Sequence, residues 1–345
     1  MRRSRFMCAS LKATSEAAAR HAPPEHDDAR CHTTHAREHT MSGLPQKWAI
    51  AGDGTSLAYR DSGGDGVPVV FTNGYATSTY YWDGLVEALG DRVRAITWDL
   101  RGHGRSQAAR DPQSLTVGGC ADDLRRVMDA AGVERAVLVA FSFGCQIVLE
   151  AWRLMPERVM GLVPILGPFE RPFDTLISPK VGPSLFEVFR RVRPEWAGVM
   201  LKAGAWSGRM PGVHGAAQLT GVVGRGVRAE AMRPFYETLG GIDAASWHAL
   251  GVAAQEHSAR DLLETIDVPT LVIAGGRDVF SPGELGREMA ALIPGARLMW
   301  LDEATHTGLL GHPEPIAAAV RTYLREIAPA HRAGTSQPET EVAPA

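Results

Sequence analysis

Cysteine is scarce in this chain, with four residues in 345. Cys8, Cys31, Cys120 and Cys145 show no CxxC or disulfide-like spacing, which is typical of a protein that folds in a reducing compartment. Long apolar runs are also lacking. The basic start Met-Arg-Arg-Ser-Arg imitates a signal peptide, but Lys12 interrupts the segment before an apolar core of sufficient length develops. We therefore predict a cytoplasmic protein without a transmembrane span.

A large excess of charge is absent as well. The formal net charge of −3 gives no reason to expect nucleic acid or an anionic membrane as a partner. Hydrophobic residues make up 45% of the chain, which is ordinary for a globular protein and sufficient for a sizeable core. The length allows one large domain with an insertion, or two domains. No feature of the sequence predicts the oligomeric state.

The first 42 residues have few large apolar side chains, many charges and several histidines close to Cys31. A metal site is one interpretation, since His35 and His39 stand one helical turn apart. A disordered tail over 1–42 is the interpretation that we adopt, because this composition cannot form a core. Met41 begins a stretch typical of a native start, and we predict that the residues before it are dispensable.

The stretch around which the rest of the chain can be organised is Val137-Leu-Val-Ala-Phe-Ser-Phe-Gly-Cys145. Its first residues form a continuous apolar run, as a strand covered on both faces requires. Ala140 and Gly144, two positions to either side of Ser142, are small enough for a strand to turn sharply into a helix. Such a turn exposes the serine hydroxyl and directs the positive end of the helix dipole towards a ligand. A serine that merely caps a helix is the alternative.

This turn resembles the nucleophile elbow of the α/β-hydrolase fold family, whose pattern is G-x-S-x-G, with Ala140 in place of the first glycine. Asp99-Leu-Arg-Gly-His-Gly-Arg-Ser106 is similar to the D-x-R-G-x-G-x-S turn of that family, and Gly275-Gly-Arg-Asp278-Val-Phe-Ser-Pro282 is similar to its acid loop. The resemblance covers about Trp48 to Ile327. It implies an α/β fold with a doubly wound, mostly parallel sheet and an inserted helical lid.

The domain organisation follows the alternation of apolar strands with amphipathic helices. This alternation lapses between about Gly167 and Ala259, where helical patches rich in aromatic residues and methionine take its place. We expect some of these side chains to line a substrate pocket, among them Trp196, Met200, Trp206, Met232, Phe235, Tyr236 and Trp247. The predicted parts are an α/β core (43–168 and 257–328), a helical lid (169–256) and disordered tails (1–42 and 329–345).

Ser142, Asp278 and His306 occur in the chain order that the resembled family uses for its catalytic triad, and each follows a predicted strand. A serine hydroxyl needs a general base to attack a carbonyl, and the base needs a carboxylate to hold its tautomer. The resemblance therefore implies Ser142 as nucleophile, His306 as base and Asp278 as acid.

Other residues compete for these roles. Glu170, just after the strand that follows the elbow, is the alternative acid. His103 lies in the turn before the elbow and is interpreted as structural, and Asp99 and Arg101 are expected to pair and hold that turn. The histidines considered as alternative bases are His214, His248, His257 and His312.

The same resemblance implies an oxyanion hole formed by the backbone N–H groups of Tyr75 and Phe143. The family usually has His-Gly where this chain has Asn73-Gly74, so only the backbone role of this loop is carried over. A simple Asn-Gly turn at the end of a strand is the alternative.

These features predict a serine hydrolase that cleaves a small carboxylic ester, lactone or thioester through an acyl-enzyme on Ser142. No metal or organic cofactor is required by this chemistry. A cofactor-free haloperoxidase or perhydrolase and a C–C bond hydrolase are alternatives within the same family, and a ligand-binding protein without turnover is an alternative of another class. Dehalogenases and epoxide hydrolases are disfavoured, because they carry aspartate at the elbow.

Overall fold

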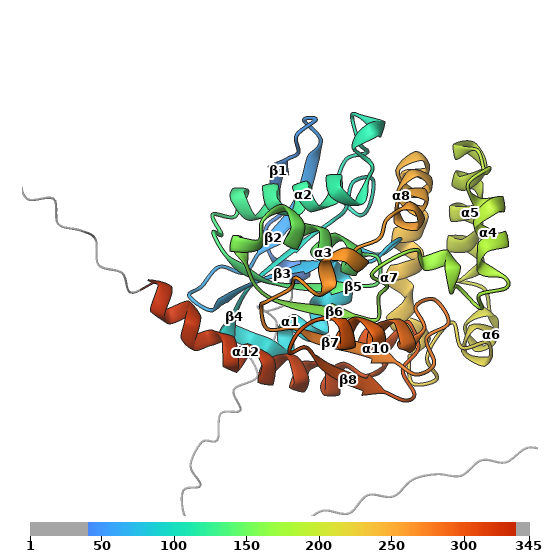
Figure 1. The fold of residues 1–345 in the computed structure, drawn as a ribbon. Coiled ribbons are helices and arrows are strands. Elements are labelled where there is room, and N and C mark those ends of the chain that lie inside the picture. The colour runs from blue at the N-terminus through green and yellow to red at the C-terminus, as the bar shows by residue number, and fades with distance from the viewer. Residues whose placement is uncertain (1–40, 336–345) are drawn as a thin grey trace, which may run out of the picture. The chain divides into compact units, whose positions relative to one another are not determined.

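The computed structural model describes residues 41–335, which contain a single sheet of eight strands. The strands are β1 (Lys47–Ile50), β2 (Ser56–Asp61), β3 (Val67–Thr72), β4 (Val93–Trp98), β5 (Ala136–Phe141), β6 (Val159–Ile165), β7 (Leu271–Gly275) and β8 (Arg297–Leu301). Their order across the sheet is β1-β2-β4-β3-β5-β6-β7-β8 (Figure 1). Only the pairs that involve β1 and β2 are antiparallel, so the predicted mostly parallel sheet is confirmed.

Helices cover both faces of this sheet, because successive residues of each central strand point to opposite sides. Leu138 of β5 packs in one core with helices α2 (Val117–Ala130), α3 (Gly144–Leu154) and α10 (Gly283–Leu292). Its neighbours Val137 and Val139 pack in a second core with α1 (Asp83–Leu89), α11 (Gly308–Gly311) and α12 (Pro313–Thr335). The continuous apolar runs in the sequence therefore correspond to strands buried on both faces.

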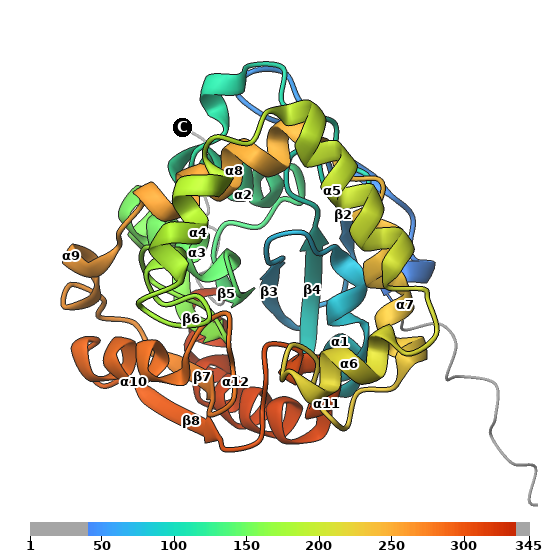
Figure 2. The same ribbon diagram turned by 90° about the vertical axis from the view of Figure 1, so that its right-hand side faces the viewer.

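A helical insertion separates β6 from β7. Its helices are α4 (Gly182–Phe189), α5 (Pro194–Ser207), α6 (Val213–Leu219), α7 (Ala229–Leu239), α8 (Ala244–Glu256) and the short α9 (Arg260–Leu263). Figure 2 shows α4 and α5 in front of α8 on the side where the central strands end. The helices α4 to α8 fall within the predicted 169–256, and their role as a lid stays a prediction.

The structure differs from the predicted boundaries at both ends of the described residues. Met41 is only 1% exposed and packs in the core with α1 and α12, so the predicted tail over 1–42 is wrong for its last residues. Residues 1–40, with the alternative metal site, lie outside the described residues. At the other end α12 continues to Thr335, past the predicted tail boundary at 329. Once the packed apolar face of α12 has nucleated the helix, each further residue adds a hydrogen bond at little cost in free energy, which explains why α12 continues past 328.

The turn between β4 and α2 is held differently from the prediction. Asp99 accepts hydrogen bonds from the Arg105 N–H at 3.0 Å and from Asn73 Nδ2 at 3.3 Å. Arg101 instead pairs with Asp123 of α2 and with Asp53, the latter at 2.8 Å. The predicted pair of Asp99 and Arg101 is therefore wrong, because each side chain is engaged by other partners.

Between residues 41 and 335, none of the helices has the length and apolar character needed to cross a membrane.

Candidate active site

The turn between β5 and α3 places Ser142 in a strained backbone conformation. Its φ of 54° lies in the left-handed region that residues with side chains rarely adopt. The Ser142 N–H donates to the Ile165 carbonyl oxygen at 3.0 Å, which holds the turn against β6. A side chain at Gly144 would place its Cβ 2.7 Å from the carbonyl oxygens of Thr72 and Asn73, so this position needs glycine. Ala140 is fully buried in the α2–α3 core, where its methyl group is accommodated.

A chain of hydrogen bonds joins the three residues that the sequence analysis singled out. His306 Nε2 lies 2.8 Å from Ser142 Oγ, and His306 Nδ1 lies 2.8 Å from Asp278 Oδ2. Because a carboxylate can only accept, the Nδ1–H of His306 donates to Asp278. Nε2 is then free to accept from the Ser142 hydroxyl. Asp278 and His306 follow β7 and β8, so the structure brings three loops together at the carboxyl edge of the sheet.

The Asp278 carboxylate is fully enclosed by protein. Its second oxygen, Oδ1, accepts from the backbone N–H groups of Phe280 and Ser281, each at 2.9 Å. These bonds orient the carboxylate so that Oδ2 faces His306. The side chain of His306 remains 17% exposed, which leaves it in reach of a substrate or a water molecule.

The backbone N–H groups of Tyr75 and Phe143 lie on the loops that border Ser142. In the described part of the chain neither N–H donates a hydrogen bond to a protein acceptor. Gly74 brings the two loops close, because a Cβ there would lie 2.9 Å from the Ser142 Cβ. Two free donors beside a serine can stabilise an oxyanion that forms on a carbonyl under attack.

Asn73 has a positioning role that sequence reasoning missed. Its side chain is buried, donates to the Trp98 carbonyl oxygen at 2.7 Å and accepts from the Trp82 indole N–H at 2.8 Å. These bonds anchor the loop that carries Tyr75 to the end of β4. The replacement of the common histidine by asparagine was the only signal in the sequence for such a role.

The alternative acid and bases are occupied elsewhere. Glu170 binds Arg260 at 2.7 Å and accepts from Ser258 Oγ at 2.6 Å, away from His306. His103 is completely buried, and its Nδ1 lies 2.9 Å from the Arg101 carbonyl oxygen, which agrees with a structural role. Three of the remaining candidates contact Glu150 and Gln146 (His257), the Phe189 carbonyl oxygen (His248) and the Val227 carbonyl oxygen (His214). His312 lies between α11 and α12 and does not line the cavity that contains Ser142.

A thiol lies near Ser142 but is not suited to react. Cys145 is buried at the start of α3, and burial raises the pKa of its thiol to about 12. The thiol therefore stays protonated near neutral pH. Among the described residues no cluster of three or more histidine, cysteine or acidic side chains is arranged to hold a metal ion.

A cavity of about 540 Å³ opens beside Ser142 and His306. Its wall is predominantly apolar and combines the strand-end loops with the inner sides of α5, α7 and α8. The predicted aromatic residues Phe235, Tyr236 and Trp247 contribute to it, whereas Trp196 and Trp206 do not. The sequence analysis missed the contribution of Phe173 and Phe280, which lie in a single 3-10 turn and in a loop, where no helical pattern could indicate them.

The side chain of Tyr75 joins this site to the insertion. Its hydroxyl donates to the Trp247 carbonyl oxygen at 2.6 Å, and the two rings stack with centroids 5.4 Å apart. Burial raises the pKa of the Tyr75 hydroxyl well above its usual value, so this donor stays protonated. Helix α8 is thereby held against the loop that presents the Tyr75 N–H.

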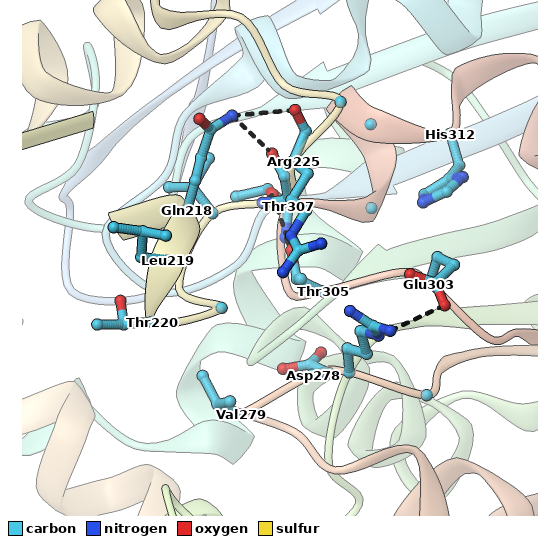
Figure 3. Close-up of a pocket in the computed structure, with 18 of the residues that line it drawn as sticks. Gln218, Leu219, Thr220, Arg225, Asp278, Val279, Glu303, Thr305, Thr307 and His312 are labelled. Carbon is cyan, nitrogen blue, oxygen red and sulfur yellow. Dashed lines mark hydrogen bonds and ion pairs between the residues drawn. The ribbon is translucent and has the colours of Figure 1, made fainter. Parts of the chain in front are cut away.

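A second cavity, of about 460 Å³, lies on the other side of Asp278 (Figure 3). Gln218 and Arg225 of the insertion face Thr305 and Thr307 of the core across it. Thr307 Oγ1 accepts from the Gly224 N–H at 2.9 Å, so the segment after α6 is tied to the loop that carries His306. Thr307 borders both cavities.

Two family models match this chain. One, described as alpha/beta hydrolase fold, matches residues 67–201, which include β3, the elbow and the first helices of the insertion. The other, described as TAP-like protein, matches residues 243–335, which include Asp278 and His306.

Individual relatives are enzymes. Pimeloyl-[acyl-carrier protein] methyl ester esterase of Stenotrophomonas maltophilia is 27% identical over 78% of this chain and 97% of its own length. An epoxide hydrolase of Caballeronia sordidicola is 28% identical over 45% of this chain, and the match spans only 48% of that enzyme. Esterase RhEst1 of Rhodococcus sp. ECU1013 is similar in structure, with a TM-score of 0.65, 23% identity, and coverage of 82% of this chain and all of the other. The last likeness shows the fold.

Proposed function

This chain belongs to the α/β-hydrolase fold family, and we propose that it is a serine hydrolase that cleaves a carboxylic ester through an acyl-enzyme on Ser142. The observation that carries this proposal is the continuous hydrogen-bonded chain from Ser142 through His306 to Asp278. The elbow serine also distinguishes this chain from the aspartate chemistry of epoxide hydrolases.

The reaction proceeds in two steps. His306 Nε2 takes the Ser142 proton, and the serine oxygen attacks the ester carbonyl to form a tetrahedral intermediate. The N–H groups of Tyr75 and Phe143 stabilise its oxyanion, and the protonated His306 returns the proton to the departing alcohol. In the second step His306 activates water, which attacks the acyl-enzyme, and the acid product leaves. Asp278 holds the histidine tautomer and stabilises the imidazolium throughout.

The substrate that fits best has an apolar acyl or alcohol part of moderate size. The cavity of about 540 Å³ beside Ser142 falls within the range of small-molecule sites, and its wall is mostly apolar. Esters, lactones and acyl thioesters share the carbonyl chemistry that this site would use. A screen of these three classes with the wild-type protein would identify the preferred bond.

Replacement of Ser142 by alanine tests the proposal directly. We expect Ser142→Ala to abolish turnover of p-nitrophenyl butanoate and labelling by a fluorophosphonate probe, because both require the serine oxygen. Ser184→Ala, at an exposed position on α4 that borders neither cavity, is the matched control and should retain both. Retention of most of the esterase rate by Ser142→Ala would refute the assignment.

A further inference from the structure

The outer surface of α4 and α5 exposes apolar side chains that a helix of a globular protein normally buries. Trp196 and Trp206 of α5 are 64% and 66% exposed, and Val188 of α4 is 66% exposed. Together with Val199 and Met200 they form what we call the α4–α5 face. Large contiguous apolar surfaces on a protein mark sites of interaction.

Helix α5 is apolar on both of its sides. One side is buried by residues spaced four apart, namely Ala197, Leu201 and Ala205. Trp196, Val199 and Trp206 recur at helical spacing on the opposite side. A helix that is apolar all round is usually enclosed by protein. In Figures 1 and 2, α4 and α5 instead lie at the outside of the molecule, with no described element over them.

Beyond the first turn of α5, the charges in this helix and in the segment after it are basic. The connection between α4 and α5 adds little to them, because Arg190, Arg191 and Arg193 form ion pairs with Glu187 and Glu195 at 2.8 to 3.4 Å. From Trp196 to Ala229 the chain has no aspartate or glutamate, whereas Lys202, Arg209, Arg225 and Arg228 fall in this stretch. The net charge of −3 for the whole chain therefore conceals a positively charged region.

We propose that the α4–α5 face docks on a lipid bilayer that contains anionic phospholipid. Tryptophan is favoured at the boundary between headgroups and acyl chains, since its ring is apolar and its N–H is polar. Lysine and arginine beside an apolar helical stripe are attracted to anionic headgroups. Lys202 is exposed on α5, and Arg209 is exposed in the turn just after this helix, so the two charges follow the exposed Trp196 and Trp206 in the chain.

A second copy of this chain fits the face less well. In a two-fold symmetric contact the same patch would face itself, which would bring Lys202 and Arg209 of both copies together in a stretch without acidic residues. An anionic lipid surface neutralises the same charges. The face also lies on the outer side of α5, whose inner side lines the apolar cavity beside Ser142. Docking would thus place that cavity about one helix diameter, roughly 10 Å, from the lipid surface.

Vesicle sedimentation tests this proposal with the full chain. We expect the protein to sediment with phosphatidylcholine vesicles that contain phosphatidylglycerol, more weakly with phosphatidylcholine alone, and to be released at about 1 M salt. Trp196→Ser/Trp206→Ser should weaken vesicle binding by about ten-fold or more, because this variant lacks the two indole rings that the bilayer would bury. Lys202→Gln/Arg209→Gln should weaken binding only to the anionic vesicles. Hydrolysis of a water-soluble ester by each variant reports separately on the active site.

The matched control is Trp48→Ser/Ile50→Ser, which removes side chains that are 50% and 57% exposed on the edge strand β1. This variant should bind vesicles like the wild type. The proposal would be overturned if Trp196→Ser/Trp206→Ser and Trp48→Ser/Ile50→Ser lost vesicle binding equally, or if the wild type did not bind vesicles. So would gel filtration showing a dimer that only the Trp196→Ser/Trp206→Ser variant dissociates, or binding of an acidic carrier protein in place of vesicles.

Discussion

Ser142 and Gly144 show how single residues shape the site. The serine adopts a left-handed φ of 54°, a conformation that costs about 1–3 kcal/mol and persists only where the surroundings enforce it. The close approach of Gly144 to the carbonyl oxygens of Thr72 and Asn73 is one such constraint. The strained conformation of Ser142 is therefore supported by packing between the end of β3 and the start of α3.

Replacing Gly144 by alanine should disturb this arrangement. The added Cβ would lie 2.7 Å from two backbone oxygens, so we expect Gly144→Ala to lower the free energy of unfolding by about 1–3 kcal/mol and to reduce kcat. Urea unfolding and ester hydrolysis measure the two effects. Ala140→Gly, which restores the usual family pattern, is the control and should cost about 1 kcal/mol of stability without loss of kcat. A larger loss of stability and kcat in Ala140→Gly than in Gly144→Ala would contradict this account of the turn at Ser142.

The role of Asp278 can be separated from its structural contacts. Asp278→Asn keeps an oxygen that can accept from the Phe280 and Ser281 N–H groups but places an amide N–H₂ opposite His306 Nδ1. The histidine would then adopt the wrong tautomer, and we expect kcat to fall by about 10⁴-fold with little change in Tm. Steady-state hydrolysis of a p-nitrophenyl ester measures the loss. The exposed Asp267→Asn should behave like the wild type, and a comparably small effect at both positions would exclude the proposed role.

At the scale of the elements, the antiparallel edge of the sheet depends on Asp61 at the end of β2. Its carboxylate accepts from Arg94 Nε and Nη2 of β4 and from Lys47 of β1. Burial alone would raise its pKa, but these hydrogen bonds outweigh burial and lower the pKa to about 2. The folded state therefore binds this proton less readily than the unfolded chain does.

This shift predicts a dependence of stability on pH. The stabilisation from Asp61 is fully present above its unfolded pKa of about 4 and is lost as the pH falls towards 2. We expect Asp61→Asn to be less stable than the wild type at pH 7 and to lose less stability between pH 4 and pH 2. Urea unfolding at a series of pH values provides the measurement. Asp65→Asn, in the exposed loop after β2, should retain the wild-type pH profile; parallel profiles for Asp61→Asn and the wild type would refute the linkage.

For the whole molecule, the first described residues are part of the second core. Met41 is buried in the core that also contains α1 and α12, Ser42 Oγ donates to Asp83, and the Leu44 carbonyl oxygen accepts from Arg60 Nε at 3.2 Å. These contacts close the face of the sheet opposite to α2 and α3. The boundary for a minimal folded chain therefore lies before Met41.

Two truncated chains test this boundary. A chain that begins at Met41 should keep the Tm and esterase activity of the full chain, as predicted from the sequence. One that begins at Leu44 loses a buried methionine and should be destabilised by about 2–5 kcal/mol. Thermal unfolding of both chains gives the comparison. Equal Tm values for the two would show that Met41 contributes nothing to the core.

The sequence by itself determined the sheet, the order of its parallel strands along the chain and the loops that carry Ser142, Asp278 and His306. Such features depend on residues close together in the chain, whose apolar runs and glycines specify strands and sharp turns. Only the tertiary structure decided that Arg101 binds Asp123, that Asn73 anchors the loop that carries Tyr75 and that α12 continues to Thr335. It also decided which side of α5 is exposed. Partners distant in sequence are selected by packing, and periodicity alone cannot identify them.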